Sequence, residues 1–357
     1  MLSFQPEFLY SSLPVRVRFG PGIRGETAAE VERLGCSRAV VLTTPGQAAK
    51  GKALAADIGK LAAGTVALAQ MHTPVEVTQE ALRAVEELGG DCLVALGGGS
   101  VIGLGKALSL RTGLPQIALP TTYAGSEATP VLGQTEAGRK TTLTDARVQP
   151  GVVLYDAELI RSLPVSVTVA SALNAMAHAA EGLYARDRNP VSTLLAAEGL
   201  RAFRDALPVV CETPDDLAAR GETLYGAWLC GTVLGQVGMA LHHKLCHVLG
   251  GSFGLPHAET HAVMLPYTIA FNAQAAGSHL EPLREVLGTS DIGQGLAEFA
   301  DRVAAPRSLR DIGMKEDDLE RAADLAMTAA YWNPRPLVRD EILTLLRIAW
   351  SGGKGVA

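Results

Sequence analysis

Polar side chains that can bind metals or transfer protons recur at helical spacing in the second half of the chain. Asn174 and His178 lie four residues apart, and His243 and His247 repeat this spacing further along. Residues four apart share one helix face, so each pair projects in a common direction. His257 follows His243 by fourteen residues, directly behind a proline. Burying so many imidazoles costs free energy unless they have partners or a function, so the pattern predicts a shared polar site.

The remaining histidines have no comparable neighbours in the sequence, and we expect them to be structural: His72, His242, His261 and His279. A single histidine is more often a hydrogen-bonded core or surface residue than a ligand, so the prediction rests on the two pairs. For Asn174 and His178 the structural alternative is that they pair only with each other.

A glycine-rich segment follows an apolar run in the first half of the chain, Leu93-Val-Ala-Leu-Gly97-Gly98-Gly99-Ser100. Backbone amides at a helix N-terminus, with no Cβ in the way, bind phosphate or pyrophosphate well. The segment is not a Walker A loop, because Ala107 follows Lys106 where Ser or Thr is required, and Ile102 excludes a GxGxxG motif. A tight turn alone needs fewer glycines, so we predict a phosphate-binding loop.

These motifs need elements that hold them in place. Four apolar or β-branched runs indicate buried strands: Ala39–Thr43, Cys92–Leu96, Gln116–Leu119 and Val152–Tyr155. Alanine-rich stretches between them indicate helices, near Gly46–Leu61, Thr78–Leu88 and Val101–Leu110. This alternation predicts a mostly parallel sheet covered by helices.

Beyond residue 158 the strand signals stop and helical periodicity takes over. The predicted helices are Ser166–Ala185, Pro190–Ala206, Asp215–Leu234, Leu241–Leu249 and Leu337–Trp350, with Ser166 as a cap and Gly277 and Gly313 as helix ends. Residues 132–149 and 351–357 look irregular. We therefore expect a Rossmann-like α/β domain over residues 1–157 and an all-helical catalytic domain over 158–357. Ligand clefts often lie between two such domains.

The composition of the chain excludes several classes of function. The chain has 357 residues, 48% of them apolar, and a formal net charge of −6, with no basic cluster that would suit nucleic acid. No apolar stretch approaches the ~20 residues of a membrane span, so we expect no membrane partner. Five cysteines without a CxxC pair indicate free thiols. Together with an N-terminus unlike a signal peptide, they predict a cytoplasmic protein.

The motifs, in this order, resemble the iron-containing alcohol dehydrogenase-like superfamily over nearly the full chain. The matching segments are Gly97–Ser100, Thr121–Glu127, Asp156–Leu159, Asn174–Glu181, His243–His247 and Pro256-His257. The resemblance implies the dehydroquinate synthase-like fold, an N-terminal domain for NAD or NADP, a helical C-terminal domain and a homodimer.

The resemblance also implies roles in cofactor binding. The pyrophosphate would be cradled by Gly97, Gly98, Gly99 and Ser100. Phosphate, adenine or nicotinamide would be contacted by Thr121, Thr122 and Ser126. Further cofactor-lining positions are matched by Thr73, Lys140 and Leu159. The predicted strand Ala39–Thr43 is followed by Thr44, without the acid that grips a ribose 2′-hydroxyl in members strict for NAD. A 2′-phosphate is then not repelled, so we expect both NADH and NADPH to work.

Metal-dependent members of this superfamily hold their ion with an Asp and three histidines at positions that correspond to Asn174, His178, His243 and His257. Asn174 offers only a neutral amide oxygen, which weakens a divalent site. Three imidazoles alone can still hold zinc, so zinc or iron stays open. We expect a vestigial site and a reaction that needs no metal. His247 matches a histidine near the nicotinamide.

Asn at position 174 is similar to the maleylacetate reductase branch, as are Arg16–Gly20, the Tyr123 loop and Asn333-Pro-Arg335-Pro336. That branch implies reduction of the C=C bond of a small keto dicarboxylate, maleylacetate, to 3-oxoadipate in the breakdown of aromatic and chloroaromatic compounds. Conjugate reduction leaves an enolate, which hydrogen-bond donors can stabilise without a metal. We therefore expect His243 to lead the chemistry, with His178, His247 and Asn174 in support.

The substrate carboxylates need cations or donors. Arg335 is the first candidate, because two flanking prolines rigidify it and a guanidinium binds carboxylate bidentately, and Tyr123 is the second. Lys244, Lys140 and Arg139 are further candidates, and a surface role for Arg335 is an equal alternative.

Three other functions compete. The first is a metal-dependent alcohol or polyol dehydrogenase of the same superfamily that tolerates Asn174. The second is a dehydroquinate synthase-like lyase, which needs a full metal set and more basic residues than the sequence has. The third is a non-catalytic nucleotide-binding protein, which the retained histidines argue against.

Overall fold

A computed structural model describes residues 7–136, 139–328 and 330–353, apart from the side chains of Arg139 and Lys140. The chain divides into two compact units. The first is Ser12–Leu163, and the second runs from Pro164 onward and includes the N-terminal residues up to Ser11. Each unit is described by itself.

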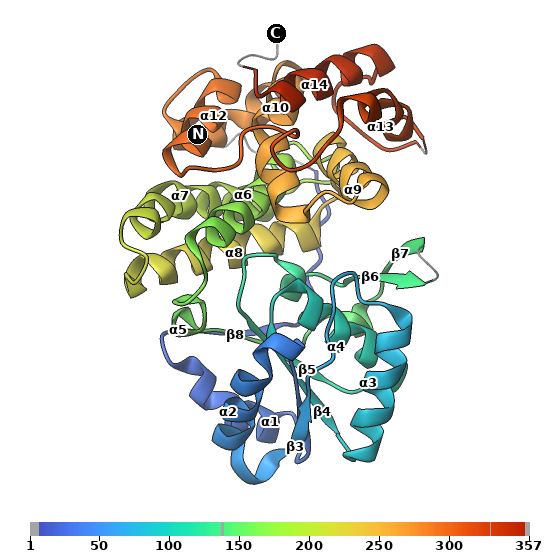
Figure 1. The fold of residues 1–357 in the computed structure, drawn as a ribbon. Helices are drawn as coiled ribbons and strands as arrows, with labels where there is room; N and C mark the ends of the chain where they lie inside the picture. Colours follow the sequence, from blue (N-terminus) through green and yellow to red (C-terminus); the bar gives the residue numbers. More distant parts are fainter. Residues whose placement is uncertain (1–6, 137–138, 329, 354–357) are drawn as a thin grey trace. The chain divides into compact units, whose positions relative to one another are not determined.

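The first unit is built on a parallel sheet with the strand order β1-β8-β5-β4-β2-β3 (Figure 1). Its strands are β1 (Arg16–Phe19), β2 (Ala39–Leu42), β3 (Ala62–Val66), β4 (Cys92–Gly97), β5 (Gln116–Pro120) and β8 (Val152–Tyr155). The inner strands β2, β4, β5 and β8 are buried at every position, which explains their continuous apolar sequence. The main helices are α1 (Thr27–Arg33), α2 (Ala48–Ile58), α3 (Val75–Glu87) and α4 (Gly99–Thr112), with the short α5 (Ala157–Ile160) after β8.

The inner strands and the three predicted helices of this unit are confirmed, and the expectation of an irregular segment over 132–149 is wrong. An antiparallel hairpin, β6 (Val131–Glu136) and β7 (Arg139–Thr144), occupies most of that segment. Strand β6 alternates between buried and partly exposed residues, and β7 carries three threonines rather than an apolar run. The edge strands β1 and β3 were not predicted. Both strands are only partly buried, so neither has a continuous apolar sequence.

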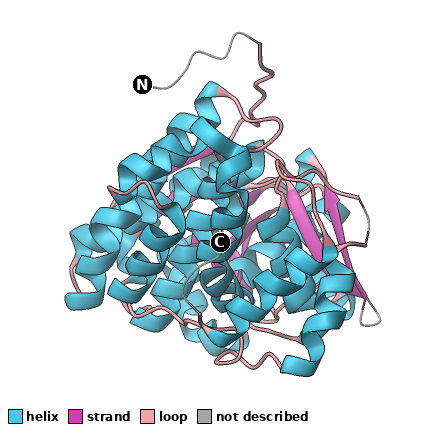
Figure 2. Cartoon of the chain, turned by 90° about the horizontal axis from the view of Figure 1, so that it is seen from above, coloured by secondary structure: helices cyan, strands magenta, loops and turns pink. Residues whose placement is uncertain are grey.

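The second unit is helical (Figures 1 and 2). Its helices are α6 (Val165–Gly182), α7 (Pro190–Glu212), α8 (Leu217–Gln236), α9 (Leu241–Phe253), α10 (His257–Ala276), α11 (Glu281–Leu287), α12 (Ile292–Arg302), α13 (Leu319–Ala326) and α14 (Arg339–Ser351). Helix α6 is buried throughout its length from Thr168 to Gly182, because α7, α8 and α10 pack around it. Small residues make this possible: a Cβ on Gly182 would lie 2.3 Å from the Val233 side chain.

The observed helix ends can be compared with the three residues predicted to cap or end helices. Gly277 ends α10 with a φ of 56°, as predicted. Ser166 is not a cap, because α6 begins directly after Pro164 and Ser166 lies inside it. Gly313, with a φ of 102°, lies in a turn rather than at the end of a helix. No single helix in the described ranges is long and apolar enough to cross a membrane, and α8 with α9 pass that test only jointly, bent by 97°.

Candidate active site

Three helices of the second unit bring the predicted polar residues together. Asn174 and His178 project from α6, His243 and His247 from α9, and His257 begins α10. Asn174, His178 and His243 are 2%, 3% and 6% exposed, whereas His247 and His257 are exposed. Asn174 and His178 lie on the fully buried part of α6, and His243 lies on the buried face of α9, so two imidazoles and an amide lie inside the domain core.

The imidazole rings form one continuous cluster. The ring centroids of His178 and His243 lie 5.2 Å apart, and those of His243 and His247 lie 6.2 Å apart. The rings of His247 and His257 stack with centroids 6.3 Å apart. The cluster also contains His261, whose centroid lies 4.5 Å from that of His257 and 5.0 Å from that of His243. His242 also belongs to the cluster, with its centroid 4.9 Å from that of His261, so the spacing in the sequence identified the group but missed two of its members.

Glu181 fixes the orientation of His243. Its Oε2 lies 2.6 Å from Nδ1 of His243, and its Oε1 accepts the backbone amide of His242 at 2.8 Å. Burial opposes ionisation of this carboxyl, but the hydrogen bond from His243 lowers its pKa below the ordinary value. An ionised Glu181 can only accept, so Nδ1 of His243 carries the proton and Nε2 is the ring's remaining functional atom. The sequence did contain a signal for Glu181. It is an acid one helical turn after His178, in a helix that is otherwise almost entirely apolar.

Four buried atoms of the cluster accept or donate no hydrogen bond within the described chain: Asn174 Oδ1, His178 Nδ1, His243 Nε2 and His261 Nε2. No hydrogen bond joins Asn174 to His178, so the alternative that these two residues only pair with each other is wrong. Buried polar atoms normally have partners, and a set of four without them marks a binding site. Burial, followed by the neighbouring histidines, lowers the pKa of His178 well below its ordinary value.

His242 and His261, which we expected to be merely structural, form an ordered chain of hydrogen bonds with Thr268. Nδ1 of His242 lies 2.7 Å from Oγ1 of Thr268, and Nε2 of His242 lies 2.9 Å from Nδ1 of His261. Burial lowers the pKa of His242 to about 3, so the ring is neutral. His261 is likewise fully buried and neutral, because burial lowers its pKa well below the ordinary range.

The positions that correspond to a metal site do not form one here. The group lacks an anionic ligand because Asn174 replaces the acid. The ligand atoms of His178, His243 and His257 do not all lie within 4.8 Å of one another. Across the described residues, the one group of histidine, cysteine and acidic side chains whose ligand atoms lie that close together is His242, Cys246 and His261. The residues therefore do not fit the metal implied by the superfamily.

The glycine loop of the first unit lies where β4 ends and α4 begins. Gly98 is the N-cap of α4, and the first amides of a helix have no partners within the helix, so they are available to an anion. A Cβ on Gly98 would lie 2.9 Å from Oγ1 of Thr122, and one on Gly103 would lie 2.6 Å from Oγ1 of Thr73. These glycines keep the backbone in direct contact with two of the threonines predicted to line the cofactor.

The other predicted cofactor residues lie at nearby edges of the same unit. Thr121 is buried, Thr44 and Ser126 are half-buried, and Leu159 packs against the sheet core. The side chain of Lys140 lies outside the described residues. Lys106 is not a phosphate-binding lysine, because it is buried and donates hydrogen bonds to Thr129 and to the carbonyl of Val131 at 2.7 to 3.0 Å. Lys106 instead anchors α4 to the segment after β5.

The residues predicted for substrate carboxylates have partners of their own. Arg335 pairs with Glu341 at 2.9 Å, and its guanidinium lies 4.1 Å from the ring centroid of Phe271. Asn333 ties this loop to α9, because its Oδ1 accepts the amide of Leu241 at 3.4 Å. Lys244 donates to the carbonyl of Thr328. Tyr123 is fully buried in the first unit.

Comparison with known proteins identifies the family. Residues 14–157 match the model for iron-containing alcohol dehydrogenase, and residues 168–350 match the C-terminal model of the Fe-containing alcohol dehydrogenase family. The maleylacetate reductase of Rhizobium sp. strain MTP-10005 is 56% identical over 97% of this chain and 99% of its own. That of Burkholderia cepacia is 50% identical over 97% and 98%.

The crystal structure of maleylacetate reductase from Agrobacterium tumefaciens is also similar, with 55% identity and a TM-score of 0.96 over 99% of this chain and 100% of that one. The 1,3-propanediol oxidoreductase structure shares the fold at 23% identity, with a TM-score of 0.89 over 96% of this chain and 100% of that one. The expected fold is thereby confirmed, and so is the family: this chain belongs to the Fe-containing alcohol dehydrogenase family, in its maleylacetate reductase branch.

Proposed function

We propose that this chain reduces the C=C bond of maleylacetate with NADH or NADPH and yields 3-oxoadipate, a step in the breakdown of aromatic and chloroaromatic compounds. The observation that carries the proposal is identity of 50% and 56% to maleylacetate reductases over nearly the whole chain. The free thiols of Cys36, Cys92, Cys211, Cys230 and Cys246 fit work in the reducing cytoplasm, and we expect a homodimer.

The bound nicotinamide cofactor supplies the hydride. The N-terminal amides of α4, opened by Gly98 and Gly99, would bind its pyrophosphate, and Thr121, Thr122 and Ser126 would line it. Thr73, Lys140 and Leu159 are further proposed contacts. Thr44, where β2 ends, offers a hydroxyl rather than an acid, so a 2′-phosphate meets no like charge there.

The substrate is a dicarboxylate whose ketone is conjugated to a C=C bond. Hydride addition to the carbon β to the ketone shifts the π electrons onto oxygen as an enolate, and a proton then adds to the neighbouring carbon. One hydride and one proton are consumed, and the ketone is regenerated. Because the negative charge is shared between oxygen and carbon, donors can stabilise it without a metal ion.

His243 is the proposed donor. Glu181 holds its Nδ1–H, so a proton on Nε2 makes the ring an imidazolium, and its centroid lies 5.2 Å from that of His178. That N–H can donate to the enolate oxygen or pass its proton to carbon. Asn174 and His178 would orient the substrate, and the exposed His247 would support the nicotinamide side of the site.

We propose that the reaction needs no metal. Asn174 leaves a dianionic substrate free of the repulsion that an aspartate would add. The lack of convergence among His178, His243 and His257 supports the same conclusion. A metal-dependent alcohol or polyol dehydrogenase would instead need these side chains to gather around an ion.

Arg335 and Tyr123 remain the proposed contacts for the substrate carboxylates. Arg335 would exchange Glu341 for a substrate carboxylate, which a half-exposed ion pair permits at small cost. An Arg335→Lys variant keeps the charge but loses the bidentate geometry, so its Michaelis constant for substrate should rise. An unchanged constant would remove Arg335 from the site.

The function is tested by the oxidation of NADH and NADPH with chelator-treated enzyme, with maleylacetate and simple aldehydes as competing substrates. We expect turnover of maleylacetate with both cofactors and none of the aldehydes. Loss of activity on chelation, with aldehyde turnover restored by metal, would support the alcohol dehydrogenase instead.

A further inference from the structure

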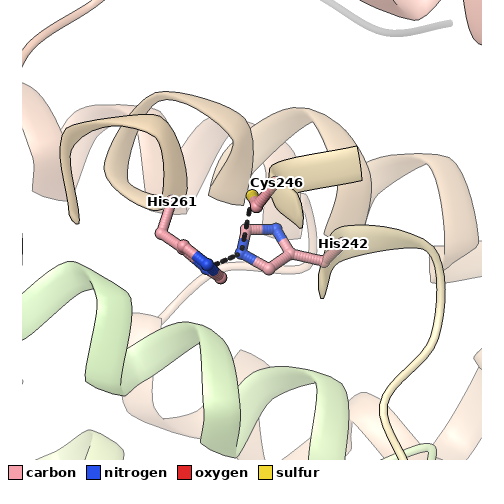
Figure 3. Close-up of side chains that lie close together, drawn as sticks. All are labelled: His242, Cys246 and His261. Carbon is pink, nitrogen blue, oxygen red and sulfur yellow. Dashed lines mark hydrogen bonds between the residues drawn. The ribbon is translucent and has the colours of Figure 1, made fainter. Parts of the chain in front are cut away.

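Three buried ligand atoms converge next to the proposed active site. His242 and Cys246 lie one turn apart on α9, and His261 faces them from α10 (Figure 3). Nε2 of His242 lies 2.9 Å from Nδ1 of His261 and 3.7 Å from Sγ of Cys246. All three side chains are fully buried. One ligand atom from each lies within 4.8 Å of the others, which no other group of histidine, cysteine and acidic residues achieves in the part of the chain that the structure describes.

We propose that His242, Cys246 and His261 form a binding site for a thiophilic divalent cation such as zinc or cadmium, separate from the vestigial positions around Asn174. Two imidazole nitrogens and a thiolate are a donor set that these ions prefer. Zinc–ligand bonds of about 2.0 to 2.3 Å place the ligand atoms of a tetrahedral site about 3.3 to 3.7 Å apart. The separations from Nε2 of His242, 2.9 Å to His261 and 3.7 Å to Cys246, lie close to this range, and the ligand atoms of Cys246 and His261 lie within 4.8 Å of each other.

The hydrogen bond between His242 and Thr268 orients the first ligand. The hydroxyl of Thr268 donates to the carbonyl of Met264 at 2.9 Å, so it accepts a hydrogen bond from Nδ1–H of His242 at 2.7 Å. That assignment leaves a lone pair on Nε2 of His242, directed at Cys246 and His261. Ligand histidines in metalloproteins are characteristically held in this way by an oxygen behind the ring.

Proton positions change when the ion binds. In the metal-free chain Nδ1–H of His261 donates to His242, so Nε2 of His261 has a lone pair and no partner. Coordination through Nδ1 requires that proton to move to Nε2, where the unpartnered atom can accept it. Cys246 loses its thiol proton to solvent, and burial, which raises the pKa of this thiol, makes the ion necessary for that step. The nearby carboxylate of Glu181 offsets the remaining positive charge.

Occupancy of this site would alter the proposed active site. The ring centroid of His261 lies 4.5 Å from that of His257 and 5.0 Å from that of His243. Ion binding would place a proton on Nε2 of His261, which carries an unpartnered lone pair in the metal-free chain, in a ring that contacts both of these histidines. We therefore expect cadmium or zinc to inhibit the enzyme without binding at Asn174 or His178.

Cadmium binding to the chelator-treated, full-length protein tests the proposal. Equilibrium dialysis with elemental analysis gives the stoichiometry, and the ultraviolet thiolate-to-cadmium absorption reports a sulfur ligand without any mutation. We expect about one tightly bound cadmium per chain with this absorption, and binding at least about tenfold weaker in Cys246→Ser and His261→Gln. Thr268→Val should weaken binding by about 10- to 100-fold while all three ligands remain.

Two variants serve as matched controls. Cys230 is equally buried but belongs to no such group, and His257 occupies a vestigial metal position. Cys230→Ser and His257→Gln should bind cadmium as the unaltered protein does. The proposal is overturned if the unaltered protein binds no cadmium, if Cys246→Ser keeps the absorption, or if His257→Gln abolishes binding while His261→Gln does not.

Discussion

Oε2 of Glu181 lies 2.6 Å from Nδ1 of His243, and both residues are buried. The same carboxylate accepts the backbone amide of His242 at the start of α9, so one acid supports the first turn of the helix and orients the ring of His243. A carboxylate that neutralises and orients an imidazole is a usual support for general acid–base chemistry.

Replacement of Glu181 by glutamine should lower kcat about 10- to 100-fold with a smaller change in KM, because the His243 ring loses the carboxylate that accepts its Nδ1–H and fixes its orientation. The His243→Ala variant should have the lowest kcat of the series. Its kcat should fall about 100- to 10,000-fold if His243 is the proton donor. Steady-state kinetics with maleylacetate provide both values. The control is Glu198→Gln, which alters an ion pair with Arg201 on α7. Turnover by Glu181→Gln equal to that of the control would contradict the role of this pair.

An aspartate at position 174 should raise KM for maleylacetate by about tenfold or more, because a buried negative charge repels the dianion. Asn174→Leu removes the amide without adding charge, so its KM should rise less than that of the aspartate variant. Initial rates over a range of substrate concentrations give the comparison. Equal Michaelis constants for Asn174→Asp and the unaltered enzyme would show that the neutral amide is not an adaptation to substrate charge.

Alanine at Gly98 should weaken cofactor binding, because its Cβ would lie 2.9 Å from Oγ1 and 3.0 Å from Cγ2 of Thr122. Loss of one charge-assisted hydrogen bond to the pyrophosphate corresponds to about a 10- to 100-fold rise in the dissociation constant for NADH. Fluorescence titration measures that constant directly. Gly46→Ala is the matched control, since a Cβ there meets nothing within 4 Å. Identical constants for both variants would place the pyrophosphate elsewhere.

The stability of the first unit should depend on pH through Lys106. Burial lowers the pKa of this lysine from 10.5 to about 7. Between these values the unfolded chain binds the proton and the folded chain does not, so stability should rise with pH across that window. Lys106→Met removes the titration and should flatten this dependence, whereas Lys60→Met at an exposed position should not. Thermal unfolding across the window is the measurement, and an unchanged slope in Lys106→Met would exclude Lys106 as its source.

Local sequence was sufficient where one element carries the signal. The inner strands are buried on both faces and appear as apolar runs, and the pairs Asn174 with His178 and His243 with His247 share helix faces. His261 could not be placed in this way, because its proximity to His243 depends on how α10 packs against α9. The hairpin at Val131–Thr144 escaped prediction because its pairing, rather than an apolar core, defines it.

The site of hydride transfer tests metal-free conjugate reduction most directly. Chelator-treated enzyme is supplied with maleylacetate and with NADH that carries deuterium at the transferred position, and the product is examined by NMR and mass spectrometry. We predict 3-oxoadipate with one deuterium on the carbon β to the ketone, and the solvent proton on the adjacent carbon. An alcohol with deuterium on the former carbonyl carbon, or a reaction that stops until metal is restored, would contradict the proposed mechanism.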